Sequence, residues 1–351
     1  MTDPTPGARA LRGIGPREGL RPGLVWPAAV DPTAIDGPTR GQARGPRYRK
    51  SSFGLYVPAE VDGTGEQRIV EAAATYRAGV VTGWAGLAWL AARWFKDTER
   101  PVPLALQADE GTSAQPHLVA VTQEFLHPDE VIRLDGLRIT TALRSVSFEM
   151  RHAPTVLQAA QAFAMAAYDD LVSIEELRAY CATHLPRCTG VGRVREALAR
   201  LTENAWSPTE VSMAWHWKDE HPEAGLLHNC PIFDRSGRHV ATVDVLDPDG
   251  GVVGEYHGGL HLAGQQRAED VVREERLRAT GLEVVVMVSP DLSDPTGFLA
   301  RLDSAYERAV GRTRRWTVEQ PPWWTDTSTV EARRALTGVR RERLLRYRSA
   351  A

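Results

Sequence analysis

The sequence predicts an α/β (α+β) protein whose C-terminal half holds a mixed β-sheet with helices on both faces, preceded by a second α+β region. Three observations lead to this class. Residues 226–257 contain three consecutive stretches of strand character, and the last two are joined at residues 247–251 by Asp-Pro-Asp-Gly-Gly, which is typical turn chemistry. A helical pattern at 263–280 separates this meander from an apolar stretch at 283–288. Such a crossover helix requires the last strand to pair in parallel.

The first 52 residues are rich in Pro, Gly and Arg and have little periodicity, so we expect a mostly extended or disordered arm. Within it, residues 39–50 hold five basic side chains and no acid. Such a run is able to lie along a phosphate backbone, and it is equally typical of a solvated tail. The candidate phosphate or DNA contacts in this arm are Arg40, Arg44, Arg47, Arg49 and Lys50.

Residues 53–205 form the predicted α+β region. Trp84, Leu87, Leu90, Ala91 and Trp94 recur at helical spacing, which favours a packed core over a stacking platform for bases. The expected elements are strands at 52–61, 102–107, 117–123, 131–134 and 137–141, helices at 67–77 and 83–95, and a helical bridge at 142–204.

The bridge contains one cluster of cysteine and histidine residues with the side-chain types of a zinc site. Cys181, His184 and Cys188 have suitable residue types, but no second ligand pair at the usual spacing follows, and buried thiols on a helix account for them better. Ser173 followed by Glu176 predicts a capping box at the start of that helix.

Composition limits the functional classes. The net charge is −3, so binding of nucleic acid would have to come from local basic patches. No stretch approaches the roughly 18 apolar residues of a membrane span, and the N-terminus has no apolar signal core. We therefore expect a cytoplasmic protein without membrane contact, and make no prediction about its oligomeric state.

The predicted hairpin carries the candidate chemistry. Asp244 lies on its first strand, and Glu255 and His257 lie two apart on its second strand, so the last two side chains share a face. Two carboxylates beside an imidazole make a plausible site for a hard divalent cation and an activated water. Acids at strand ends are also commonly just solvated, so both interpretations stay open.

A helix is predicted to begin just before this sheet. Ser207 fits the N-cap, Pro208 the first helical position, and Glu210 lies three residues after the cap. Glu210 is therefore a capping residue or a further acid of the site.

Residues 206–300 resemble the DUF559 group of restriction-endonuclease-like (PD-(D/E)xK) nucleases, which is similar to very-short-patch repair endonucleases. The resemblance rests on Glu-Tyr-His-Gly-Gly-Leu-His at 255–261, on Asp270, Arg273, Leu277 and Gly281, and on the strand at 282–288. It implies a nuclease domain at 206–311, Glu210 turned toward a metal, and catalytic roles for His257 and His261. His257 stands where the motif has lysine, and no lysine follows Lys218.

The region before it resembles AbiEi-type antitoxins of type IV toxin–antitoxin systems, on the phrases FGLYVPAEV at 53–61 and VVTGWAGLAWL at 80–90. Those proteins usually begin with a winged helix, of which this chain shows at best the final wing. The last 40 residues, 312–351, read as a basic tail, since seven arginines and one glutamate occupy 333–348. A phosphate-binding helix and a solvated helix both fit that composition.

Together these patterns predict a DNA endonuclease or nickase that uses Mg²⁺ or Mn²⁺ held by Asp244 and Glu255, with no other cofactor. Arg273 is a candidate phosphate contact or a helix-surface ion pair. The alternative is a DNA-binding regulator of the antitoxin type with a degenerate nuclease domain, and that function would imply a cognate toxin as partner.

Overall fold

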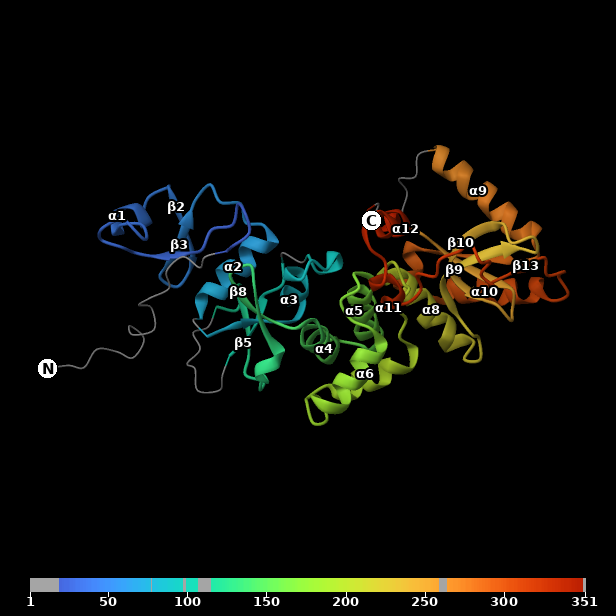
Figure 1. Ribbon diagram of the computed structural model, residues 1–351, viewed down its shortest axis with the longest axis horizontal. Helices are drawn as coiled ribbons and strands as arrows, with labels where there is room; N and C mark the ends of the chain where they lie inside the picture. The colour runs from blue at the N-terminus through green and yellow to red at the C-terminus, as the bar shows by residue number, and fades with distance from the viewer. Residues whose placement is uncertain (1–18, 77, 97–98, 107–114, 259–263, 350–351) are drawn as a thin grey trace. The chain divides into compact units, whose positions relative to one another are not determined.

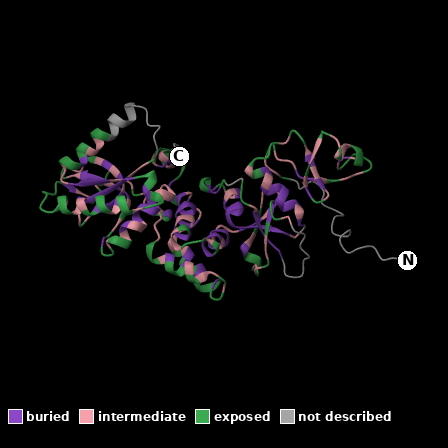
Figure 2. Ribbon diagram, turned by 180° about the vertical axis from the view of Figure 1, so that it is seen from behind, coloured by how far each residue is buried: buried purple, intermediate pink, exposed green. Residues whose placement is uncertain are grey.

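The computed structural model describes residues 19–76, 78–96, 99–106, 115–258 and 264–349, with the side chains of 264–270 left aside. The chain divides into two compact units, residues 1–149 and 150–351. The described part holds twelve α-helices and three antiparallel or mixed sheets, so the predicted α+β class is confirmed (Figure 1). The central strands of the two five-stranded sheets are largely buried, whereas the strands of the three-stranded sheet are mostly half-buried or exposed (Figure 2). Among the described helices, none has the length and apolar character needed to cross a membrane.

The first sheet belongs to the segment expected to be an extended arm, and its folding corrects that expectation. Strands β1 (Ala28–Ala29), β3 (Leu55–Pro58) and β2 (Tyr48–Ser52) pair antiparallel in that order, and helix α1 spans Arg40–Ala43. Arg49 on β2 donates to the buried Glu71 carboxylate at 2.5 and 3.0 Å. A polar sequence is thus ordered by a tertiary ion pair, which periodicity does not reveal.

The second sheet of the first unit has the order β6-β5-β4-β8-β7, with parallel pairing of β5 with β6 and of β4 with β8. The strands of this sheet are β4 (Val80–Val81), β5 (Val102–Ala105), β6 (Val119–Thr122), β7 (Val131–Leu134) and β8 (Leu137–Thr140). The helices of this part of the chain are α2 (Gly65–Thr75), α3 (Gly83–Trp89) and α4 (Ala142–His152), and the last of these continues into the second unit. Trp84 and Leu87 are buried as predicted, but the helix ends before Ala91, whose φ of 68° is left-handed. Trp94 is consequently 40% exposed.

The second unit begins with helices α5 (Val156–Tyr168), α6 (Ile174–Thr183), α7 (Val191–Ala197) and α8 (Pro208–Glu220). The predicted capping box at Ser173 is confirmed. The predicted start of α8 is confirmed as well, because the Ser207 side chain accepts from the Glu210 N–H and Pro208 opens the helix.

The five-stranded sheet of this unit has the order β12-β11-β10-β9-β13. Its strands are β9 (Leu227–Asp234), β10 (His239–Asp247), β11 (Val252–His257), β12 (Glu283–Val288) and β13 (Trp316–Thr317). As expected, β11 and β12 pair in parallel across helix α9 (Gly264–Ala279). The short β13 was not expected, since two residues carry no periodic signal; it is held by pairing with β9 and by the buried Trp316.

Helices cover both faces of this sheet. On one face, Met213 and Trp217 of α8 and Phe298 of α10 (Thr296–Ala309) form a core with the strands. On the other, Leu277 of α9 packs over them. A Cβ on Gly254 would lie 2.8 Å from the Trp217 ring, so glycine is what allows α8 this close to β11.

The C-terminal residues are not simply a solvated basic tail. They form helices α11 (Val330–Arg334) and α12 (Gly338–Leu344), and Arg333 and Arg348 are buried against the Asp170 carboxylate at 2.6 and 2.8 Å. These two arginines are therefore structural contacts within the second unit. For them, the prediction of a phosphate-binding or solvated helix was wrong.

Candidate functional site

Asp244 and Glu255 come together in the middle of the second unit's sheet. The β10–β11 register pairs Val245 with Gly254, and one further step places Asp244 opposite Glu255. The Tyr256 N–H donates to Asp244 Oδ2 at 2.8 Å, which fixes one carboxylate oxygen against the neighbouring strand. Glu255 is only 5% exposed and Asp244 is half-buried, so these acids are not freely solvated residues at strand ends.

Glu210 joins this pair from the N-terminus of α8. Its Oε2 accepts from the Trp206 N–H at 2.8 Å and from Asn229 Nδ2 at 2.6 Å, while Oε1 accepts from Ser207 Oγ at 2.9 Å. Glu210 is 6% exposed. The residue therefore caps its helix and also belongs to the acid cluster, so the two predicted roles do not exclude each other.

The pKa of each of the three carboxylates is raised, in every case mainly by burial. Burial, followed by the charge of Asp244, raises the pKa of Glu255 to about 8, against the lowering effect of Arg273. Burial and then Asp244 likewise raise the pKa of Glu210 to about 8, although three hydrogen-bond donors oppose it. The pKa of Asp244 is raised mainly by burial. A buried set of acids with this electrostatic cost is typical of sites that bind a cation or move protons.

Arg273 of α9 supplies one positive charge at the cluster. Its Nη1 donates to Glu255 Oε2 at 2.6 Å and its Nη2 to the Thr242 carbonyl oxygen at 2.5 Å. Of the two roles predicted for Arg273, a phosphate contact or an ion pair, the structure shows the ion pair. The partner, Glu255, is itself a candidate metal ligand. The guanidinium side chain remains 36% exposed, so it is still accessible from solvent.

His257 lies on the same strand as Glu255, and its charge would lower the pKa of Asp244, so the imidazole is part of the same electrostatic group. Together with Arg273 and Glu255 it lines a cavity of about 20 Å³ under α9. A cavity of this size holds a single water molecule or small ion. His261 lies outside the described residues, as does the Asp270 side chain.

The donor set fits a hard cation in part. Within the described residues, no group of three or more His, Cys, Asp or Glu side chains is arranged to hold a metal. However, Glu255 Oε1 is buried without a hydrogen-bond partner among those residues. The neighbouring acids, Asp244 and Glu210, provide further carboxylate oxygens that could serve as metal ligands. Mg²⁺ prefers oxygen ligands and often takes only one or two carboxylates, keeping waters or substrate phosphates as its other ligands. Asp244 and Glu255 suit that mode.

Other predicted site residues are not brought into this cluster. Arg40, Arg44, Arg47, Arg49 and Lys50 belong to the first unit, where all but Arg49 are exposed and Arg49 is committed to Glu71. In the second unit, Cys181 is buried and Cys188 partly so, while His184 stacks on Tyr180 with ring centroids 4.7 Å apart.

Asn229 was missed by sequence reasoning. It donates to Glu210 Oε2 and, at 2.6 Å, to the Asn204 carbonyl oxygen, so it links the acid cluster to the segment before α8. Its φ of 42° is left-handed, which asparagine tolerates better than most residues. An asparagine in the middle of a predicted strand was the available signal.

Comparison of the chain with protein-family models, with curated proteins and with solved structures finds no match. The resemblances stated above therefore remain predictions, and the case for function depends on the geometry of the site.

Proposed function

We propose that the second unit is a restriction-endonuclease-like domain that hydrolyses phosphodiester bonds in DNA with Mg²⁺ or Mn²⁺. The observation that carries the proposal is the cluster of the buried Glu255 and Glu210 with the half-buried Asp244, in which Glu255 Oε1 lacks a partner among the described residues. A divalent cation would supply that partner and offset the repulsion among the acids. The element order of α8, meander, α9, β12 and α10 supports the fold assignment.

Asp244 and Glu255 would hold the cation, which when bound supplies Lewis-acid polarisation of a phosphoryl oxygen and a more acidic water. His257 lies beside them and offers an imidazole nitrogen that can accept the proton of the attacking water. Arg273, being partly exposed, can turn from Glu255 toward a phosphate oxygen. Glu210 is positioned by three donors and keeps the acid cluster in place. A role for His261 in protonating the leaving oxygen is proposed from the resemblance alone.

The experiment is cleavage of supercoiled plasmid by the full chain with Mg²⁺, Mn²⁺ or EDTA. Asp244→Asn and Glu255→Gln keep side-chain volume but remove candidate ligands, and Asp249→Asn removes an exposed acid of the same hairpin as the matched control. We expect metal-dependent nicking by wild type and Asp249→Asn only. Equal nicking by all variants would show that the hairpin is not the site.

Two observations favour a second function, a DNA-binding regulator of the antitoxin type. The Arg273 guanidinium already forms an ion pair with Glu255, and the motif lysine is replaced by His257. A degenerate site stabilised by arginine would bind DNA without cutting it. Salt-sensitive DNA binding with no cleavage and no Mn²⁺ binding would select this function, and a cognate toxin would then be the partner to search for.

A further inference from the structure

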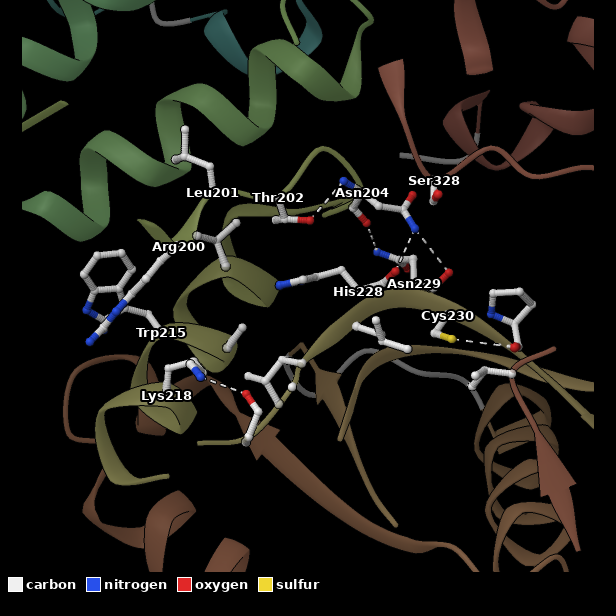
Figure 3. A pocket seen from close by; sticks show the side chains of 18 of the residues that line it. Arg200, Leu201, Thr202, Asn204, Trp215, Lys218, His228, Asn229, Cys230 and Ser328 are labelled. Carbon is white, nitrogen blue, oxygen red and sulfur yellow. Dashed lines mark hydrogen bonds between the residues drawn. The ribbon is translucent and has the colours of Figure 1, made fainter. Parts of the chain in front are cut away.

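The second unit contains a larger cavity of about 720 Å³, formed by α8, the segment before it and β9 (Figure 3). This volume lies within the roughly 300–1,000 Å³ of small-molecule sites. Its lining includes apolar side chains such as Leu201, Val211 and Leu226, and Figure 3 shows Trp215, Lys218, Asn204 and His228 around the same space.

The charge of the lining selects for an anion. Arg200 and Lys218 line the cavity, and none of the described lining residues is acidic. Lys218 Nζ donates to the Ala224 carbonyl oxygen at 2.8 Å, and the Arg200 guanidinium lies 4.6 Å from the centre of the Trp215 ring. Arg200 also pairs with Asp219, which is half exposed, so part of its charge is compensated. Two cations beside an indole suit an anionic group attached to a flat ring.

The opposite wall is polar and incompletely satisfied. His228 Nδ1 is buried and has no hydrogen-bond partner among the described residues. Burial lowers the pKa of His228 to about 4, so the ring is neutral at pH 7 and presents one donor and one acceptor nitrogen. Asn204 Nδ2 donates to the His228 and Asn229 carbonyl oxygens at 2.7 and 3.4 Å, so the hydrogen-bonding atom that this amide still offers is its oxygen, an acceptor.

The Cys230 thiol on this wall does not add a nucleophile. Burial raises its pKa to about 12, which keeps it protonated and unreactive at neutral pH. The cavity is therefore suited to binding rather than to covalent chemistry.

We propose that this cavity binds a nucleotide, with its base against His228 and Asn204 and its phosphate at Arg200 and Lys218. A nucleobase has a flat face that can pack against the apolar walls. Its edge carries both hydrogen-bond donors and acceptors, so it can provide the partner that His228 Nδ1 lacks. The nucleotide can be a free nucleoside phosphate or one turned out of a strand, since both present the same chemistry.

This inference does not depend on cation binding at the acid cluster, although Asn229 lines the cavity and also donates to Glu210. The two proposals can therefore fail separately. Binding is measured on the full chain in EDTA, by calorimetry and by saturation-transfer NMR, with the four common nucleoside monophosphates, their nucleosides and a short single-stranded oligonucleotide as probes.

Two variants test the cavity itself. Gly225 lines the cavity, and a Cβ at this position meets nothing within 4 Å, so Gly225→Trp adds a bulky side chain at the cavity wall without a backbone clash. We expect this variant to weaken the binding of every probe. The double variant Arg200→Gln, Lys218→Gln should lower the affinity for nucleoside monophosphates about tenfold or more, and should change the affinity for nucleosides little. Arg195→Gln, which changes an exposed arginine of α7, is the charge control and should bind every probe as wild type does.

The outcomes separate the sources. Monophosphate binding that Gly225→Trp weakens indicates a free nucleotide, whereas loss of oligonucleotide binding alone in that variant indicates a nucleotide held in a strand. The proposal is wrong when no probe binds at millimolar concentration, or when Gly225→Trp, verified as folded by its unchanged unfolding midpoint, binds as wild type does.

Discussion

Two buried carboxylate sites in the second unit differ in how their charge is balanced. Asp170 follows α5 and is 6% exposed at its side chain; it pairs with Arg333, Arg341 and Arg348. Burial would raise its pKa, but hydrogen bonds from Arg348 and Arg333 prevail and lower it to about 2. Glu255 is equally buried, has one arginine and two acidic neighbours, and its pKa is raised to about 8.

The comparison shows that burial alone does not mark a functional acid. At Asp170 three guanidinium groups over-compensate one carboxylate, and the result is a clamp that fastens the C-terminal residues to α5. At Glu255 the acids outnumber the cations, and one oxygen is left without a partner among the described residues. The first arrangement stabilises the fold, whereas the second leaves room for a ligand with positive charge.

The largest expected effect is on stability at the clamp. Asp170→Asn removes the charge while retaining a residue that tolerates the left-handed φ of 60°. Because it leaves Arg333, 1% exposed, and Arg348 without their counter-ion, we expect the free energy of unfolding to fall by about 3–5 kcal/mol in urea denaturation. Glu176→Gln, whose ion pair with Arg334 is partly exposed, should cost less than about 1 kcal/mol. Equal losses in both variants would contradict the clamp.

At the acid cluster we expect activity and stability to change in opposite directions. Asp244→Asn should lower plasmid cleavage at least about 100-fold, since loss of a metal ligand removes about 3 kcal/mol of transition-state stabilisation. The same variant relieves repulsion with Glu255 and Glu210, so its unfolding free energy without metal should equal or exceed that of wild type. Parallel loss of stability and activity would make Asp244 a structural acid like Asp170.

Arg273 competes with a cation for Glu255, so Arg273→Gln should bind Mn²⁺ about tenfold more tightly in a calorimetric titration. Arg278→Gln, which removes an exposed ion pair with Glu274 on the same helix, is the control and should leave the affinity unchanged. Weaker Mn²⁺ binding in Arg273→Gln would mean that the arginine organises the site instead of occupying it.

The smallest effect is the pH dependence of the clamp. The pKa of Asp170 is about 2 in the folded chain and near its ordinary 3.8 when unfolded, so its stabilisation is complete above about pH 4 and is lost as the pH falls toward 2. One group changes stability by at most about 1.4 kcal/mol per pH unit. The difference in unfolding free energy between wild type and Asp170→Asn should shrink between pH 5 and pH 3, measured in urea. A constant difference would show that Asp170 acts through hydrogen bonding alone.

Much of the second unit's framework was predictable from sequence because its signals are local. The start of α8 follows from the chemistry of Ser207 and Pro208, and the parallel pairing of β12 follows from chain connectivity across α9. The facing of Asp244 and Glu255 follows from strand alternation and a tight turn. Strand β13 and the folded segment at 28–52 were not predictable, since they depend on partners distant in sequence.

The sequence by itself determined the α+β class, the hairpin and the presence of two acids and an imidazole on it, because strand and turn periodicity act between neighbouring residues. Only the tertiary structure decided what balances each charge: Arg273 on Glu255, Asn229 on Glu210, and three arginines from the last 20 residues on Asp170. Composition counts charged residues, but their pKa and their roles depend on burial and on partners up to 178 positions apart in the chain.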